Sequence, residues 1–205
     1  MSAIRLGTRA STLATTQSEM VAGLLRSEGL DVNLTTITTH GDTSTASLAA
    51  MGGIGVFASA IRAALLEGEA DIAVHSFKDL PTGRPLGLAI GAVPARADPR
   101  DALVARDGLT LHDLPQEASV GTGSPRRAAQ LLAVRPDLTI VDIRGNVDTR
   151  LGRVKGLGRY AKNGGKEDLD AVVLAASGLA RLGHSGAVTE FLDPSGVLPG
   201  RAQGW

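Results

Sequence analysis

The strongest constraint on the fold is an alternation of short β-branched runs with amphipathic helical stretches along the whole chain. We expect strands at 4–7, 32–38, 71–75 and 88–93, and then at 102–105, 119–121, 138–143 and 169–174. We expect helices at 11–26, near 57–65, at 126–134 and from about residue 147. Such alternation is typical of α/β proteins with mainly parallel sheets flanked by helices.

The clearest helix follows a glycine-rich segment. Its apolar positions are Phe57, Ala60, Ile61, Ala64 and Leu65. The spacing repeats every three or four residues, so these side chains form one stripe that can pack on a sheet.

A break at 93–100, with prolines and mixed charges, suits an extended crossover between two domains. A second turn-rich stretch at 193–200 can return the chain to the first domain. We therefore expect one domain from 1–94 and 195–205 and another from 100–190, joined by crossovers at 95–99 and 191–194. Residues 155–168, rich in glycine and charge, predict a solvated loop.

Composition argues against several classes of function. Lys and Arg number 21, as do Asp and Glu, and the five aromatic residues are too few for base stacking, so no nucleic-acid partner is expected. The sequence contains no signal-like start and no apolar run of about 18 residues, which predicts a cytoplasmic protein without a membrane partner. The absence of cysteine and the scattered histidines predict no metal site.

Basic residues follow several of the expected strands. They are Arg9, Lys78, Arg126, Arg127 and Arg144. Any one of them is as often a surface ion pair as a ligand contact. Ligands of open α/β sheets bind where strands end, so the set predicts a substrate with several anionic groups.

Two segments among these residues favour anion chemistry. In GTGSPRR (121–127), Thr122 and Ser124 precede a helix start, which suits an anion cradle, although helix capping by Ser124 explains part of the pattern. Asp79, beside Lys78, can stabilise a developing cation, but a self-paired surface dipeptide is the alternative. Asp42 fits a turn better than a site.

The ordered set of motifs resembles the hydroxymethylbilane synthase (porphobilinogen deaminase) family over residues 4 to about 199. The motifs are GTRAS (7–11), GD (41–42), GGIGVF (52–57), DIAVHSFKDLP (71–81), DPRD (98–101), GTGSPRR (121–127), RGNV (144–147), TRL (149–151) and GLARLG (178–183). Each motif alone is weak, but the ordered set is highly specific.

The resemblance implies a transferase of tetrapyrrole, porphyrin and haem biosynthesis. Such an enzyme joins porphobilinogen units stepwise into the linear polypyrrole hydroxymethylbilane and releases ammonia. It also implies two lobes like those of periplasmic binding proteins, with a cleft between them. On this resemblance Asp79 is catalytic, and the residues expected to hold the dipyrromethane cofactor are Lys78, Asp79, Thr122, Ser124, Arg126, Arg127 and Gly145. Those expected to bind substrate carboxylates are Arg9, Ser11, Gln17, Arg144, Arg150 and Arg181.

The chain departs from the family in ways that bear on activity. The family attaches its cofactor to a cysteine in a third, C-terminal domain, which we expect to be missing here, and this sequence contains no cysteine. We therefore expect the chain alone to be inactive, and to be a monomer that associates through the surface a third domain covers. Around Ala50 and Ile54 the lysines of some relatives are also absent. The alternative function is a non-catalytic, two-lobed binding protein for small carboxylates.

Overall fold

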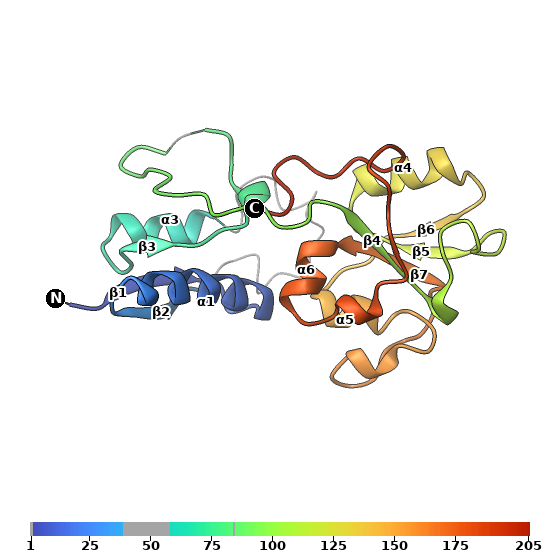
Figure 1. The fold of residues 1–205 in the computed structure, drawn as a ribbon, viewed down its shortest axis with the longest axis horizontal. Helices are drawn as coiled ribbons and strands as arrows, with labels where there is room; N and C mark the ends of the chain where they lie inside the picture. Colours follow the sequence, from blue (N-terminus) through green and yellow to red (C-terminus); the bar gives the residue numbers. More distant parts are fainter. Residues whose placement is uncertain (1, 39–57, 84) are drawn as a thin grey trace. The chain divides into compact units, whose positions relative to one another are not determined.

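A computed structural model describes residues 2–38, 58–83 and 85–205. The chain divides into two compact units, which we call unit 1 (1–95 with Trp205) and unit 2 (96–204). Their elements are labelled in Figure 1. Asp42, Phe57 and the glycine-rich segment 52–57 lie outside the described residues.

The described part of unit 1 is a parallel sheet with two helices. Its elements are β1 (Ile4–Thr8), α1 (Thr12–Ser27), β2 (Val32–Thr36), α3 (Ser59–Leu66), β3 (Ile72–Ala73) and the 3-10 turn η1 (Phe77–Asp79). The strand order is β2-β1-β3, and Leu6 of β1 lies opposite both Leu34 and Ile72. Leu6, Ala22 of α1 and Val32 form the core of this unit, so α1 packs on the sheet through its apolar side.

Unit 2 is built on a larger sheet of mixed direction. Its strands are β4 (Asp101–Ala105), β5 (Ser119–Gly121), β6 (Thr139–Val141), β7 (Ala171–Ala175) and β8 (Glu190–Phe191). Its helices and 3-10 turns are η2 (Arg106–Gly108), α4 (Pro125–Val134), α5 (Val147–Leu151), η3 (Gly158–Tyr160), α6 (Ala176–Arg181) and η4 (Ser185–Ala187). In the described chain the order is β6-β5-β7-β4-β8.

Helices cover both faces of the unit 2 sheet, with α4 on one side and α5 and α6 on the other (Figure 1). The strand residues alternate accordingly. Leu103 and Val173 pack with Leu131 of α4, whereas the neighbouring Val104 and Val172 pack in a second cluster with the helices opposite. Successive side chains of a strand point to opposite faces, so two buried faces require the continuous apolar runs seen in β4 and β7.

Three features differ from the sequence prediction. Residues 88–93 are not a strand, because an apolar run does not supply the hydrogen-bonded neighbour that a strand requires. The unit 2 sheet is mainly parallel as expected, but one of its strands, β4, runs antiparallel to both of its neighbours, β7 and β8. Residues 195–204 belong to unit 2 rather than unit 1, and Val197 packs in the same core as Leu131.

The cluster that contains Val104 and Val172 also includes Leu169, which lies just before β7. Asp170, just before β7, accepts hydrogen bonds from Arg106, Lys155 and Ser119 at 2.8–2.9 Å. These contacts tie η2, β5 and the segment after α5 to the start of β7. No helix in the described ranges is long and apolar enough to cross a membrane.

Candidate functional site

The turn between β1 and α1 carries the first predicted substrate-binding residues. Arg9 and Ser11 lie in this turn, and both are partly buried. Ser11 has the extended backbone of an N-cap residue, but its side chain makes no capping hydrogen bond, so the hydroxyl is not committed to the helix. A buried hydrogen bond of 2.7 Å between the hydroxyls of Ser18 and Thr8 fixes α1 against β1. Gln17 lies on α1 and is partly buried.

Lys78 and Asp79 lie in the 3-10 turn that follows β3, and both are exposed. The turn is anchored by Trp205, whose carbonyl oxygen accepts hydrogen bonds from the Phe77 amide at 3.0 Å and the Ser76 hydroxyl at 3.2 Å. The rings of Phe77 and Trp205 also pack edge to face, with centroids 6.2 Å apart. The carboxylate of Asp79 is therefore exposed to solvent, while hydrogen bonds to Trp205 fix the backbone of its turn.

His75 lies close to the predicted site residues of unit 1. Burial lowers the pKa of His75 below its ordinary value, and the cations Arg62 and Arg9 act in the same direction. The Asp79 carboxylate acts on this pKa in the opposite direction. Arg9 and Asp79 lie in different loops, and both were predicted as site residues. The charges of both affect the pKa of the same imidazole, that of His75.

The GTGSPRR loop of unit 2 combines capping with close backbone approach. The Ser124 hydroxyl accepts a hydrogen bond from the Arg127 amide at 3.4 Å, and Pro125 is the first residue of α4, so the capping interpretation is confirmed. The hydroxyl of Thr122 accepts from the Ser124 amide at 3.2 Å. A Cβ at Gly123 would lie 2.6 Å from the carbonyl oxygen of Ile143, so only glycine fits between these backbones.

Arg126 and Arg127 share one carboxylate. Asp101 accepts hydrogen bonds from Nη2 of Arg126 at 2.7 Å on Oδ2 and from Nη2 of Arg127 at 2.8 Å on Oδ1. Nη1 of Arg127 donates to the carbonyl oxygen of Val173 at 3.3 Å. Nε of Arg127 is buried and has no hydrogen-bond partner among the described residues.

Arg144 and Arg150 add positive charge to the same unit. Burial lowers the pKa of the Arg150 guanidinium, and the charges of Arg127 and Arg144 lower it further. Nε of Arg150 donates to the carbonyl oxygen of Gly145 at 2.9 Å, and Gly145 has a φ of +99° that favours glycine. No ion pair to Arg150 is found in the described ranges, and the carboxylate of Asp142 opposes the effect of the two arginines on its pKa.

Arg181 ends α6 in a partly desolvated position. Burial lowers the pKa of its guanidinium. Its Nη2 donates to the carbonyl oxygen of Gly204 at 3.1 Å, while Nε is buried without a hydrogen-bond partner in the described chain. A buried, unsatisfied N–H donor is costly, and an ordered water or a ligand oxygen can satisfy it.

The predicted residues therefore form one set in each unit. Unit 1 carries Arg9, Ser11, Gln17, Lys78 and Asp79, and unit 2 carries Thr122, Ser124, Arg126, Arg127, Arg144, Gly145, Arg150 and Arg181. Sequence reasoning missed the partners that hold them, Asp101, Gln203 and Trp205. Asp101 had one signal, its place in the DPRD motif, but a carboxylate before a strand does not reveal its partner.

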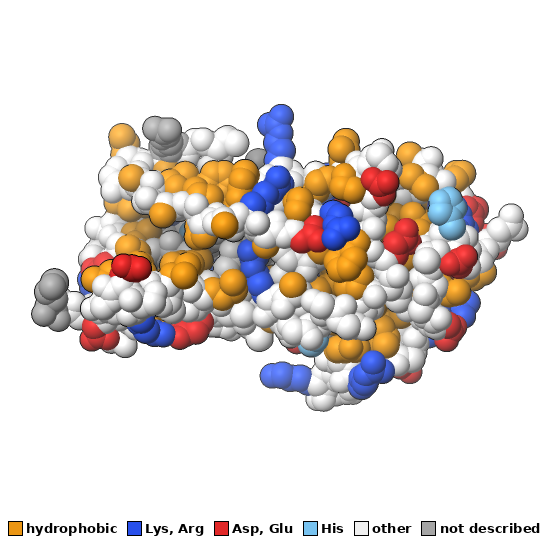
Figure 2. All heavy atoms as spheres, viewed as in Figure 1, with side chains coloured by type: hydrophobic (Ala, Val, Ile, Leu, Met, Phe, Trp, Pro, Cys, Tyr) orange, Lys and Arg blue, Asp and Glu red, His pale blue; other side chains and the backbone are white. Residues whose placement is uncertain are grey.

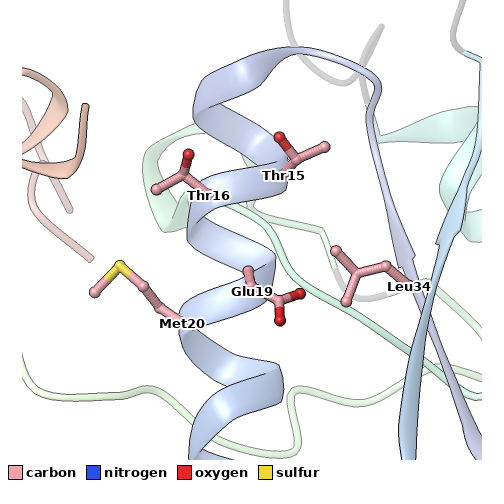
Figure 3. Close-up of a pocket in the computed structure, with 5 residues that line it drawn as sticks. All are labelled: Thr15, Thr16, Glu19, Met20 and Leu34. Carbon is pink, nitrogen blue, oxygen red and sulfur yellow. The ribbon is translucent and has the colours of Figure 1, made fainter.

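A surface depression of about 570 Å³ lies elsewhere in unit 1. Figure 3 shows its lining residues, with Thr15, Thr16, Glu19 and Met20 on α1 and Leu34 on the neighbouring strand. None of these residues is a cation, and none belongs to the predicted site.

Each of the two α/β units thus carries cations in the turns and helices that follow its strands, and unit 1 adds the exposed carboxylate of Asp79. The family model described as "Porphobilinogen deaminase, dipyromethane cofactor binding domain" matches residues 4–205. The chain therefore belongs to the porphobilinogen deaminase family.

Curated relatives agree with this assignment. The chain is 98% identical over 204 residues to the porphobilinogen deaminase of Cutibacterium acnes, covering 100% of this chain and 61% of that protein. It is 58% identical over 211 residues to the porphobilinogen deaminase of Micrococcus luteus, covering 100% of this chain and 56% of the relative. The chain thus spans about three fifths of the length of the curated relatives it matches.

The solved structures that match the chain include apo YehZ from Escherichia coli. That match has 13% identity and a TM-score of 0.46, and it covers 97% of this chain and 78% of the other. A periplasmic substrate-binding protein of an ABC transporter from Coxiella burnetii matches with 18% identity and a TM-score of 0.42, covering 93% of this chain and 80% of the other.

Proposed function

We propose that this chain supplies the catalytic and cofactor-holding units of a porphobilinogen deaminase, the transferase that condenses porphobilinogen stepwise into hydroxymethylbilane and releases ammonia. The observation that carries the proposal is the Arg150 guanidinium, which is partly buried, donates from Nε to the Gly145 carbonyl oxygen at 2.9 Å, and lies close enough to Arg127, Arg144 and Asp142 for their charges to shift its pKa. Desolvated like charges are unfavourable unless an anion joins them. Porphobilinogen carries an acetate and a propionate, which are such anions.

The donor set of unit 2 also fits a dipyrromethane cofactor, which carries the same two acidic groups on each ring. Nε atoms of Arg127 and Arg181 are buried donors without a hydrogen-bond partner in the described chain. Guanidinium groups bind carboxylates more strongly than neutral donors do. When bound, the cofactor supplies the pyrrole rings from which the polypyrrole is extended.

The proposed roles follow the two sets of residues. Lys78, Thr122, Ser124, Arg126, Arg127 and Gly145 hold the cofactor together with Asp79. Arg9, Ser11, Gln17, Arg144, Arg150 and Arg181 bind the carboxylates of porphobilinogen and of the growing chain. The Asp79 carboxylate stabilises positive charge on a pyrrole as ammonia leaves the substrate. Its solvent exposure supports this role, because an ionised carboxylate must reach the substrate without first breaking a buried ion pair.

The test of this function is Arg150→Leu in the full-length deaminase of Cutibacterium acnes, at the position that matches this chain. We expect kcat/KM for porphobilinogen to fall about 10- to 100-fold, the scale for losing a charged hydrogen bond. Ammonia release and tetrapyrrole formation are measured together. The control is Arg159→Leu, which removes an arginine stacked on Tyr160 and outside the predicted site. Equal turnover by both variants and the parent would contradict the role of Arg150.

The activity of the 205-residue chain by itself can be predicted separately. We expect it to produce no hydroxymethylbilane at a measurable rate, because the sequence contains no cysteine to tether a cofactor. The chain is purified, supplied with porphobilinogen and assayed for ammonia. Sustained turnover without contaminating full-length enzyme would show that tethering is not required.

The same preparation tests association. We propose a cytoplasmic monomer that tends to associate through apolar surface of unit 1, where Leu86 is 95% exposed and Leu24 and Ile90 are about 60% exposed. Figure 2 shows apolar side chains gathered on this unit. Exposed apolar patches promote association. Sedimentation velocity should show a mass that rises with concentration, and a constant monomer mass would contradict the proposal.

The relatives are named as deaminases, which favours this function over the binding-protein alternative. A binding protein would take up carboxylates reversibly and release no ammonia. The full-length assay described above distinguishes the two.

A further inference from the structure

Asp101 is the most completely enclosed charged group of unit 2. Its side chain is 0% exposed, although it begins β4 rather than lying within it. Each oxygen contacts a different guanidinium, Oδ2 that of Arg126 at 2.7 Å and Oδ1 that of Arg127 at 2.8 Å. One carboxylate thus fixes two neighbouring cations of the proposed cofactor-holding set.

The backbone of Asp101 is held on both sides by the sheet. Asp101 lies opposite Ala175 of β7, and its carbonyl oxygen accepts the Leu192 amide at 2.9 Å. The carbonyl oxygen of Arg100 accepts the Ala176 amide at 3.0 Å. The backbone that carries this carboxylate is therefore held rigidly by the sheet, more so than the backbone of a loop residue would be.

Gln203 completes the arrangement. Its Nε2 donates to Oδ1 of Asp101 at 2.7 Å and to the carbonyl oxygen of Pro99 at 2.8 Å, and the residue is 2% exposed. The amide orients the carboxylate while leaving Oδ2 to Arg126. Because Gln203 lies about a hundred residues from Asp101 in the chain, only the fold brings them together.

The charges show what this arrangement achieves. Burial disfavours an ionised Asp101, but the Coulombic attraction of Arg127 and hydrogen bonds from Arg127, Arg126 and Gln203 outweigh it and lower the pKa of the carboxyl. One negative charge then faces two positive charges, so a net positive charge remains. The Nη1 and Nη2 atoms of Arg127 are engaged by Val173 and Asp101, while Nε has no partner in the described residues.

We propose that Asp101, oriented by Gln203, is a positioning residue that holds the guanidinium groups of Arg126 and Arg127 for the carboxylates of the cofactor. The proposal rests on the function proposed above. Asp101 does not touch the ligand. It fixes which guanidinium atoms remain available, and so sets how well the cofactor is loaded and retained rather than the rate of the chemical step.

The first experiment uses Asp101→Asn in the full-length Cutibacterium acnes deaminase. The fraction of purified protein that carries the cofactor mass is measured by mass spectrometry, and kcat per loaded molecule is measured separately. We expect the loaded fraction to fall about tenfold, with kcat per loaded molecule within about twofold of the parent. The matched control is Asp98→Asn, which breaks the partly exposed Asp98–Arg100 pair in the same segment and should load normally. Normal loading by Asp101→Asn would overturn the proposal.

A double-mutant cycle separates positioning from general stability. In an Arg126→Leu, Arg127→Leu background, adding Asp101→Asn should change loading by less than about twofold, because the residues through which Asp101 acts are gone. An undiminished effect would show that Asp101 acts on the fold and would overturn the proposal. If Asp101→Asn does not fold, Gln203→Met leaves the Asp101 carboxylate in place and removes the hydrogen bonds of the Gln203 amide to Asp101 and to the Pro99 carbonyl oxygen, and the same loading defect is expected.

A readout independent of activity uses the 205-residue chain. The guanidinium NMR signals of Arg126 and Arg127 should exchange faster with water in Asp101→Asn, with those of Arg150 unchanged. Unchanged exchange at Arg126 and Arg127 would overturn the proposal. Failure of the parent full-length enzyme to release ammonia would instead contradict the proposed function, and the exchange result would still decide whether Asp101 holds the arginines.

Discussion

Replacing Asp79 by asparagine in the full-length Cutibacterium acnes deaminase, at the matching position, is expected to slow ammonia release at least about a hundredfold. Asn has the shape of Asp but no negative charge, so it cannot stabilise the positive charge that develops as ammonia leaves. The side chain is exposed and its turn is anchored through Phe77 and Trp205, so the fold should be unaffected. Stopped-flow measurement of ammonia release, with circular dichroism for folding, checks both statements.

The control for this experiment is Asp71→Asn. Asp71 lies just before β3 and forms an exposed ion pair with Arg5 at 2.6 Å, outside the predicted site. Exposed pairs contribute little to stability, so this variant should fold and turn over normally. Near-normal ammonia release by Asp79→Asn would remove Asp79 from the mechanism.

Replacing Asp170 by alanine is expected to lower the free energy of unfolding of this chain by about 3 kcal/mol, the lower end of the range for breaking a buried ion pair. The carboxylate accepts from Arg106 and Lys155 on one oxygen and from Ser119 on the other. Its loss leaves the Ser119 amide without that acceptor. The expectation is at the lower end because Lys155 is half exposed. Urea unfolding followed by circular dichroism measures the change.

The same site predicts a dependence on pH. Burial opposes ionisation of Asp170, but hydrogen bonds from Lys155, Ser119 and Arg106 outweigh it and lower its pKa below the ordinary value of 3.8. A lowered pKa in the folded state means that the stabilisation is present above pH 3.8 and is lost as pH falls below it. The difference in free energy of unfolding between the parent and Asp170→Ala should therefore shrink in acid.

The control for Asp170→Ala is Asp168→Asn, which breaks a more exposed pair with Arg153 and should change stability by less than about 1 kcal/mol. An equal loss in both variants would contradict the structural role of Asp170.

Local signals predicted most of the secondary structure. Pro125 after Ser124 indicated the start of α4, and the apolar stripe through Ile61 and Ala64 indicated α3. Both signals depend on neighbouring residues, which a sequence displays directly. The same holds for the strand-end cations, since a residue that follows an apolar run is placed by that run alone.

Pairing partners were not predictable in the same way. Residues 88–93 form an apolar run but no strand, and β4 pairs antiparallel with β7 although the alternation of strands with helices indicated parallel neighbours. A strand is defined by its hydrogen-bonded neighbour, and the neighbour is chosen by the packing of the whole unit. Residues 195–204 joined unit 2 for the same reason, because Val197 packs with Leu131.

The amino-acid sequence alone indicated the α/β class, the family resemblance and the residues of chemical interest. Each of these rests on a local pattern or on motifs in a fixed order. Only the tertiary structure revealed that Asp101 and Gln203 hold Arg126 and Arg127, and that Trp205 supports the turn of Asp79. Those contacts join residues 25 to 129 positions apart. Hydrogen bonds depend on separations of a few ångströms, and such separations between distant residues exist only once the strands have paired and the cores have packed.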